Sequence, residues 1–147
     1  MGMGMIISFA IVAGGLVAIQ GAVNSQLGTL LSHPLQAAFI SFLVGTLGLW
    51  IMVLILNESL PQLSQLKAIP IKLYVGGLLG AAFITATIVL IPKIGVANML
   101  IAALIGQILG SLVLDHFGLF GVPQKPIEIS RMAGAGCVVL GLYFINK

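Results

Sequence analysis

Long apolar segments alternate along the chain with short polar connections, and each connection between two such segments contains a proline. The hydrocarbon core of a bilayer is about 30 Å thick, so a spanning helix requires about 20 largely apolar residues. Proline ends helices because it lacks a backbone donor and clashes with the preceding turn. The pattern predicts an all-α membrane protein with five transmembrane helices. We expect one transmembrane domain over residues 1–147, with spans at roughly 5–27, 35–56, 71–91, 96–114 and 129–145.

The composition strengthens this prediction, because it leaves too little polar surface to cover a soluble globule. The chain is 60% hydrophobic and only 6% charged, with a mean hydropathy of +1.24. Its net charge of +3 comes from basic residues scattered singly, without the basic stripe of a nucleic-acid-binding protein. The expected surroundings are therefore a lipid bilayer and no nucleic acid. The lone cysteine, Cys137, excludes a disulfide within the chain.

Basic residues in the connections indicate the orientation in the membrane. In a chain with five spans, the N-terminus shares one side of the membrane with connections 57–70 and 115–128. That side carries Lys67, Lys72, Lys125 and Arg131, and the other side carries Lys93 and Lys147. Because cytoplasmic loops collect Lys and Arg, this distribution favours a cytoplasmic N-terminus. The excess is small, so insertion in both orientations remains open.

The connection over residues 57–70 has an apolar pattern of its own. Leu60, Leu63 and Leu66 recur at every third residue. This spacing is typical of a short amphipathic turn lying on the membrane surface. A partly buried loop explains the same leucines, and the sequence does not decide between the two.

Small residues recur at helical spacing in the last three spans. Lipid gives helices no hydrophobic reason to associate, so small residues that let backbones approach are the usual packing signal. The pairs that share a helix face are Gly76 with Gly80, Gly106 with Gly110, and Gly134 with Gly141. We therefore expect these glycines to pack against other helices in a compact bundle.

Polar side chains within the spans indicate a pathway. Gln20 and Asn24 are four residues apart in the first span and share a helix face, as do Gln107, Ser111 and Asp115 in the fourth. Polar groups in hydrocarbon cost free energy unless they are hydrogen-bonded. Two such faces predict a shared cavity that a small molecule could cross. The alternative is that these side chains only hydrogen-bond across helices and stabilise the bundle.

No carboxylate lies in the middle of a predicted span. Glu58, Asp115 and Glu128 all fall near a membrane boundary. A carboxylate buried in the membrane is the simplest proton carrier, because burial favours its protonated form. Proton coupling would therefore have to use Asp115, His116 or His33, or the energy must come from another source.

Asp115 follows directly on the fourth span, which we expect to end at residue 114. The helix dipole disfavours a carboxylate at a helix C-terminus, so a cationic partner is expected nearby. Arg131 enters the fifth span on the same side, and its planar guanidinium can bind a carboxylate through two nitrogens. The pair suggests a structural latch between the two helices. A gating or proton-handling role stays open because His116 is adjacent, and histidine changes charge between pH 5 and 8.

The motifs of enzymes are missing from the sequence. It contains no GxSxG, HExxH or CxxC and no phosphate-binding loop, and its two histidines are far apart. We therefore expect no catalytic residue, no metal and no cofactor.

Several stretches resemble a known family. The segments "GGLLGA", "PKIGVANMLIAALIGQILGSLVLDHFGLFGVP" and "RMAGAGCVVLGLYF" resemble the YdcZ-type short, five-helix family of the drug/metabolite transporter superfamily, over nearly the whole chain. The resemblance implies an exporter in the bacterial inner membrane. The small multidrug-resistance relatives carry an acidic residue in their first helix, where this chain has Gln20 and Asn24. That difference argues against proton-coupled export of cationic drugs.

The resemblance also implies an assembly. Short members resemble one half of the ten-helix transporters, which consist of two inverted repeats with the substrate site between them. A five-helix chain would then need a homodimer partner in the opposite orientation, or a related subunit. A parallel homodimer or a monomer remains the alternative.

Three functions fit these features to different degrees. The first is a small-molecule transporter that works by alternating access. The second is a non-transporting subunit or scaffold that pairs with another membrane protein, which would need small residues but little polarity within the membrane. The third, a channel, lacks any ring of charges or carbonyls in the sequence. The polar face of Gln20 and Asn24 favours the transporter, whose substrate the sequence does not identify.

Overall fold

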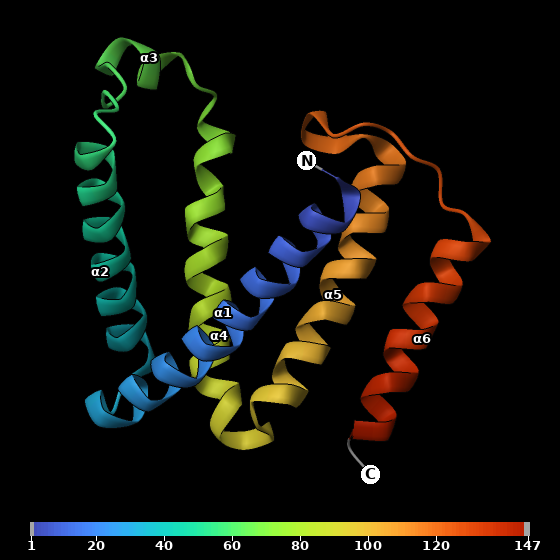
Figure 1. Ribbon diagram of the computed structural model, residues 1–147. Helices are drawn as coiled ribbons and strands as arrows, with labels where there is room; N and C mark the ends of the chain where they lie inside the picture. The colour runs from blue at the N-terminus through green and yellow to red at the C-terminus, as the bar shows by residue number, and fades with distance from the viewer. Residues whose placement is uncertain (1, 146–147) are drawn as a thin grey trace. The chain divides into compact units, whose positions relative to one another are not determined.

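The computed structural model describes residues 2–145, and its regular elements over these residues are all helical (Figure 1). Four helices are long and apolar enough to cross a membrane, and α6 is a shorter apolar helix of 17 residues. At 1.5 Å per residue α6 spans about 25 Å, the lower limit for a membrane helix. The all-α membrane class is thus confirmed. The elements are α1 (Met3–Leu31), α2 (Pro34–Ile55), α3 (Leu63–Ala68), η1 (Ile71–Tyr74), α4 (Val75–Ile94), α5 (Val96–Phe117), η2 (Leu119–Gly121) and α6 (Ile129–Ile145).

The first expected span stops four residues before the end of α1 at Leu31, and two further helix ends are wrong. The fourth span continues three residues beyond its expected end, to Phe117, because the polar Asp115 and His116 still accept helical geometry. The helix ends only at Gly118, whose left-handed backbone (φ 60°) is the usual C-terminal stop. The other error concerns Pro92, which lies inside the last turn of α4 instead of ending it. In a last turn, a missing N–H removes only one backbone hydrogen bond. Lys147, counted above for orientation, lies outside the described residues.

The connection over residues 57–70 contains the short helix α3. Its first turn is capped by Gln65, whose Oε1 accepts from the N–H of Gln62 at 2.9 Å. The hydroxyl of Tyr74, at the end of η1, donates to the carbonyl of Leu66 at 2.9 Å and so links α3 to η1. Leu66 is partly buried, whereas Leu63 is exposed. A short apolar turn therefore forms, and its position on the membrane surface stays a prediction.

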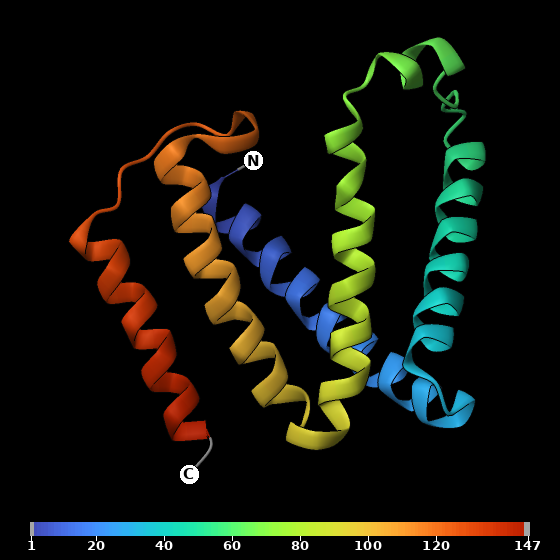
Figure 2. The ribbon, with the colours of Figure 1, turned by 180° about the vertical axis from the view of Figure 1, so that it is seen from behind.

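The chain divides into two compact units, one that ends at Lys93 and one that begins at Ile94. In the first unit, α2 and α4 lie side by side and run in opposite directions, joined through α3 (Figures 1 and 2). The C-terminal part of α1 packs against both, whereas its residues 3–17 are exposed. The core of the unit consists of Ala37 and Ala38 from α2 and Ile84 and Ile88 from α4.

Glycines make the close contact between α1 and α4. A Cβ atom on Gly21 would lie 3.0 Å from Cδ1 of Ile91, and one on Gly28 would overlap Cγ2 of Ile88. Gly21 and Gly28 are seven residues apart and therefore share one face of α1. That face was not among the small-residue faces expected from the sequence, although it follows the same spacing rule.

The glycines that the sequence singled out have a different environment. A Cβ on Gly80 would lie 3.5 Å from the ring of Phe42, an ordinary contact. No atom of the described chain lies within 4 Å of a Cβ built on Gly76, Gly106 or Gly110. The same holds for Gly134 and Gly141. Their role in packing against another chain stays a prediction.

In the second unit, α5 and α6 run in opposite directions, joined by η2 and an extended segment. An apolar groove of about 410 Å³ follows their contact. Its walls are aliphatic, and Leu112 of α5 is the most buried of them, at 8% exposed. This unit therefore packs through apolar side chains rather than through its glycines.

Candidate functional site

The polar face of α1 lies partly within the packed part of the first unit. Asn24 is 4% exposed and Ser25 is 7% exposed, and both share a face with Gly21 and Gly28. Thr87 of α4 is 2% exposed, and its methyl group would lie 3.2 Å from a Cβ on Gly21. The small residues of α1 therefore bring polar groups into the interface with α4.

The hydrogen bonds of this interface remain within each helix. Thr87 donates to the carbonyl of Phe83 at 2.9 Å, and Thr29 donates to the carbonyl of Ser25 at 3.2 Å. The Nδ2 atom of Asn24 is fully buried and has no hydrogen-bond partner among the described residues. Nδ2 of Asn24 therefore forms no hydrogen bond to another helix of the described chain.

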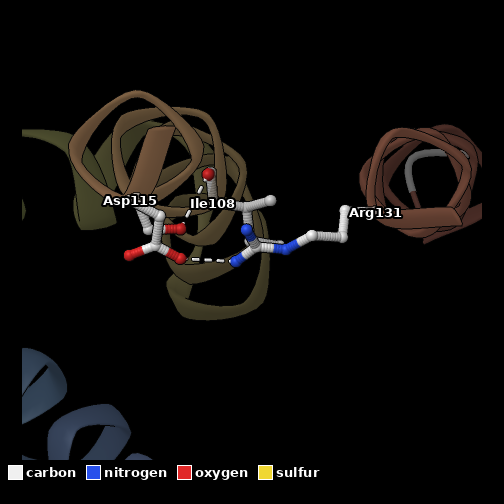
Figure 3. Close-up of polar contacts among 4 residues, drawn as sticks. Ile108, Asp115 and Arg131 are labelled. Carbon is white, nitrogen blue, oxygen red and sulfur yellow. Dashed lines mark hydrogen bonds and ion pairs between the residues drawn. The ribbon is translucent and has the colours of Figure 1, made fainter. Parts of the chain in front are cut away.

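The other pathway candidates lie on exposed helix surface. Gln20, four residues before Asn24, is exposed, and so are Gln107 and Ser111 of α5. The hydroxyl of Ser111 donates to the carbonyl of Ile108 at 2.8 Å, within its own helix (Figure 3). Because α1 and α5 belong to separate units, the predicted shared cavity remains a prediction.

Asp115 and Arg131 form an ion pair that joins α5 to α6. Nη2 of Arg131, in the first turn of α6, donates to Oδ2 of Asp115 at 2.5 Å (Figure 3). The side chain of Arg131 is 32% exposed and that of Asp115 is 27% exposed. The contact uses one nitrogen rather than the expected two, because Nη1 of Arg131 has no partner among the described residues. The predicted partner is therefore present, while its role as latch or gate stays a prediction.

The backbone beside the ion pair holds the connection between the two helices. The carbonyl of Asp115 accepts from the N–H of Lys125 at 2.8 Å. The carbonyl of His116 accepts from Nε2 of Gln124 at 2.9 Å. The left-handed Gly118 lets the chain turn back, and a Cβ there would lie 3.4 Å from the Cβ of Gln124. The roles of Gln124 and Lys125 were missed, although Gly118 after an apolar helix is a sequence signal for such a turn.

The two histidines have separate surroundings. His116 packs edge-on against Phe117, with ring centroids 4.8 Å apart, and its buried Nδ1 has no partner among the described residues. His33 is the N-cap of α2, where its Nδ1 accepts from the N–H of Leu35 at 3.3 Å. Within residues 2–145, no three His, Cys, Asp or Glu side chains group together as metal ligands would.

These features define a multi-pass membrane protein with polar groups buried between its helices. The chain belongs to the family described as "Putative inner membrane exporter, YdcZ", whose family model matches residues 5–144. It is also similar to "Inner membrane protein YdcZ" of Escherichia coli (strain K12), with 25% identity over 148 residues that cover 100% of this chain and 98% of the relative. No solved structure matches the chain. The family resemblance is therefore confirmed, and the chain is a multi-pass protein of the inner membrane.

Proposed function

We propose that this protein exports a small molecule across the inner membrane by alternating access. The family to which it belongs is described as one of exporters. The observation that carries the proposal is the buried side chain of Asn24. Helices rise about 1.5 Å per residue, so Asn24 lies about 10 Å along the axis from the C-terminal end of α1. Its Nδ2 atom is enclosed and has no partner among the described residues.

The energetics of Asn24 favour a transporter over a scaffold. A buried donor without a partner costs about 1–3 kcal/mol. A scaffold gains nothing from that cost, because an apolar residue of similar size would pack there without it. A transporter gains a hydrogen-bond donor for its substrate. Gln20, on the same helix, and Gln107 and Ser111 of α5 are the further pathway candidates in this proposal.

The working unit in this proposal is a dimer, formed by two copies in opposite orientations or by a copy and a related subunit. Residues 3–17 of α1 are exposed, and so are Gly106 and Gly110 of α5. No described atom lies within 4 Å of a Cβ built on either glycine, so a second chain has room to approach them. The small excess of basic residues on one side supports insertion in both orientations.

Flux measurements test the proposal. A thermal-shift screen of the purified protein against metabolites selects the substrate, because a ligand that binds the folded state raises its apparent stability. Efflux of that substrate from reconstituted vesicles should saturate with concentration. Asn24→Leu and Gln20→Leu should abolish efflux without lowering the protein level. Gln26→Leu, on the same helix and exposed, is the matched control and should retain it. Efflux that persists in Asn24→Leu would remove this side chain from the pathway, and a failure to transport any metabolite would favour the scaffold.

A further inference from the structure

A small pocket lies in the first unit, where the C-terminal end of α1 meets the C-terminal end of α4. The pocket is open on one side and has a volume of about 260 Å³, and none of its eight lining residues is charged. Two hydroxyl side chains of α1 and the hydroxyl of its C-cap residue Ser32 form one wall, and a proline lies on the α4 wall. The lining residues are Ser25, Gly28, Thr29, Ser32, Pro34, Ile88, Val89 and Pro92.

The hydroxyl groups offer acceptor oxygens to the pocket. Thr29 donates its proton to the carbonyl of Ser25 at 3.2 Å, so its oxygen retains only acceptor capacity. Ser25 is 7% exposed, and its hydroxyl makes no hydrogen bond to any residue that the structure describes. A hydroxyl that lines a pocket in this state is available to water or to a ligand.

Backbone carbonyls add further acceptors on both walls. Pro92 has no N–H, so the carbonyl of Ile88 lacks its regular helical donor. On α1, the N–H of Ser32 donates to the carbonyl of Thr29 at 3.3 Å, and the carbonyl of Gly28 therefore loses the donor four residues ahead. Both residues line the pocket. The missing backbone donors leave oxygen atoms available for another partner.

Two helix C-termini lie at the pocket, together with one N-terminus, that of α2 at Pro34. That N-terminus offers few donors, because Pro34 has no N–H and the N–H of Leu35 donates to Nδ1 of His33. Both α1 and α4 end here, and a helix C-terminus carries a partial negative charge. Lys93 follows Pro92 in sequence but is exposed and does not line the pocket. Acceptor oxygens and two negative helix ends favour a cation. Divalent ions prefer carboxylates, which this pocket lacks, so a monovalent ion fits its neutral oxygens better.

We propose that this pocket binds a small alkali metal cation through the oxygens of Ser25, Thr29, Gly28 and Ile88. The proposal that the ion binds is argued from the pocket and does not depend on the proposed export. The ion's further role, which rests on the export proposed above, is to couple an ion gradient to transport. No expected span has a carboxylate in its middle to carry protons, so the source of energy for export is open. An ion site would provide that source.

Thermal unfolding of the purified protein in detergent tests the binding. Sodium chloride is titrated against choline chloride, so that ionic strength stays constant while the alkali metal ion is replaced by a bulky organic cation. The midpoint should rise with sodium and reach a plateau, since an ion that binds only the folded state stabilises it. An equal midpoint in sodium and in choline at all concentrations would overturn the proposal.

Variants of the wall residues locate the ion. Ser25→Ala and Thr29→Val should each raise the apparent sodium Kd about tenfold, equivalent to about 1.4 kcal/mol, whereas Thr29→Ser should keep the response. Thr85→Val is the matched control, because Thr85 donates to Ala81 within α4 at 2.8 Å and does not line this pocket. A sodium response that survives both Ser25→Ala and Thr29→Val would overturn the assignment.

Pro92→Ala provides a test that does not depend on lost stability. The new N–H would occupy the carbonyl of Ile88, so the midpoint without sodium should rise while the sodium response falls.

Failure of this proposal is distinguishable from failure of the proposed export. Saturable export without a sodium response refutes the ion site alone, and a sodium response in a protein without export refutes the transport function alone.

Discussion

The guanidinium of Arg131, in the first turn of α6, donates to the carboxylate of Asp115, in the last turn of α5, at 2.5 Å. The backbone carbonyl of the same Asp115 accepts from Lys125 in the connection. Asp115 therefore contacts α6 through its side chain and the connection that leads to α6 through its backbone. A carboxylate at the C-terminal end of a helix is disfavoured by the dipole, and the guanidinium offsets that cost.

Removing this ion pair should lower the stability of the protein moderately. Both side chains are close to a third exposed, so solvent screens their attraction. We expect a coupling of about 1 kcal/mol in a double-mutant cycle of Asp115→Asn and Arg131→Gln. The measurement is thermal or denaturant unfolding in detergent. Glu128→Gln is the control, because among the described residues the carboxylate of Glu128 accepts only from Ser130, at 3.3 Å. If Asp115→Asn and the control give equal stability and equal transport, Asp115 is neither a latch nor a gate.

Gly28 should tolerate no larger side chain. A Cβ there would overlap Ile88 of α4, so Gly28→Ala must push the two helices apart or shift Ile88. Overpacking of this kind costs about 1–3 kcal/mol. Gly76→Ala is the control, since no described atom lies within 4 Å of its added methyl group. In that open helical position, alanine should stabilise by up to about 1 kcal/mol. Equal midpoints for the two variants would contradict the observed contact between α1 and α4.

Gly95 should be required for its backbone conformation rather than for space. It separates α4 from α5 with φ 83° and ψ 163°, a region essentially reserved for glycine. Gly95→Ala should therefore cost about 1–3 kcal/mol, although nothing lies within 4 Å of the added Cβ. Gly106→Ala, at an equally open position within α5, should cost nothing. A comparison of their unfolding midpoints decides whether conformation explains Gly95.

The proposed antiparallel dimer should be detectable by cross-linking. The exposed Cys137 is first replaced by alanine. Two tagged copies, one with Lys67→Cys and the other with Lys93→Cys, should then cross-link to each other. Linkage only between copies that both carry Lys67→Cys would indicate a parallel dimer.

The dimer proposal also predicts a role for Gly106. Gly106→Leu should reduce cross-linking without lowering the midpoint of the monomer, because no other residue of the described chain packs at that point. A large loss of monomer stability with unchanged cross-linking would show that Gly106 serves the fold rather than the assembly.

Two parts of the candidate site were predictable to different degrees, namely the ion pair between α5 and α6 and the buried polar group of α1. Asp115 and Arg131 could be paired from the sequence, since a short connection brings the end of one span near the start of the next. The burial of Asn24 was not predictable in the same way, because Gln20 on the same nominal face is exposed. α4 packs against the face of α1 that carries Gly21, Asn24, Ser25 and Gly28, and Gln20 lies outside that buried face although Gly21 beside it is buried.

The sequence by itself determined the class of the protein, because the length and polarity of a segment decide whether a helix can remain in hydrocarbon. It also determined where most helices begin and end, since proline and glycine act on the local backbone. Only the tertiary structure decided which small residues pack. Gly28 and Gly76 are alike in sequence, yet the first lies against Ile88 and the second meets no described atom. That distinction depends on where helices cross, and crossing positions depend on contacts between residues far apart in the chain.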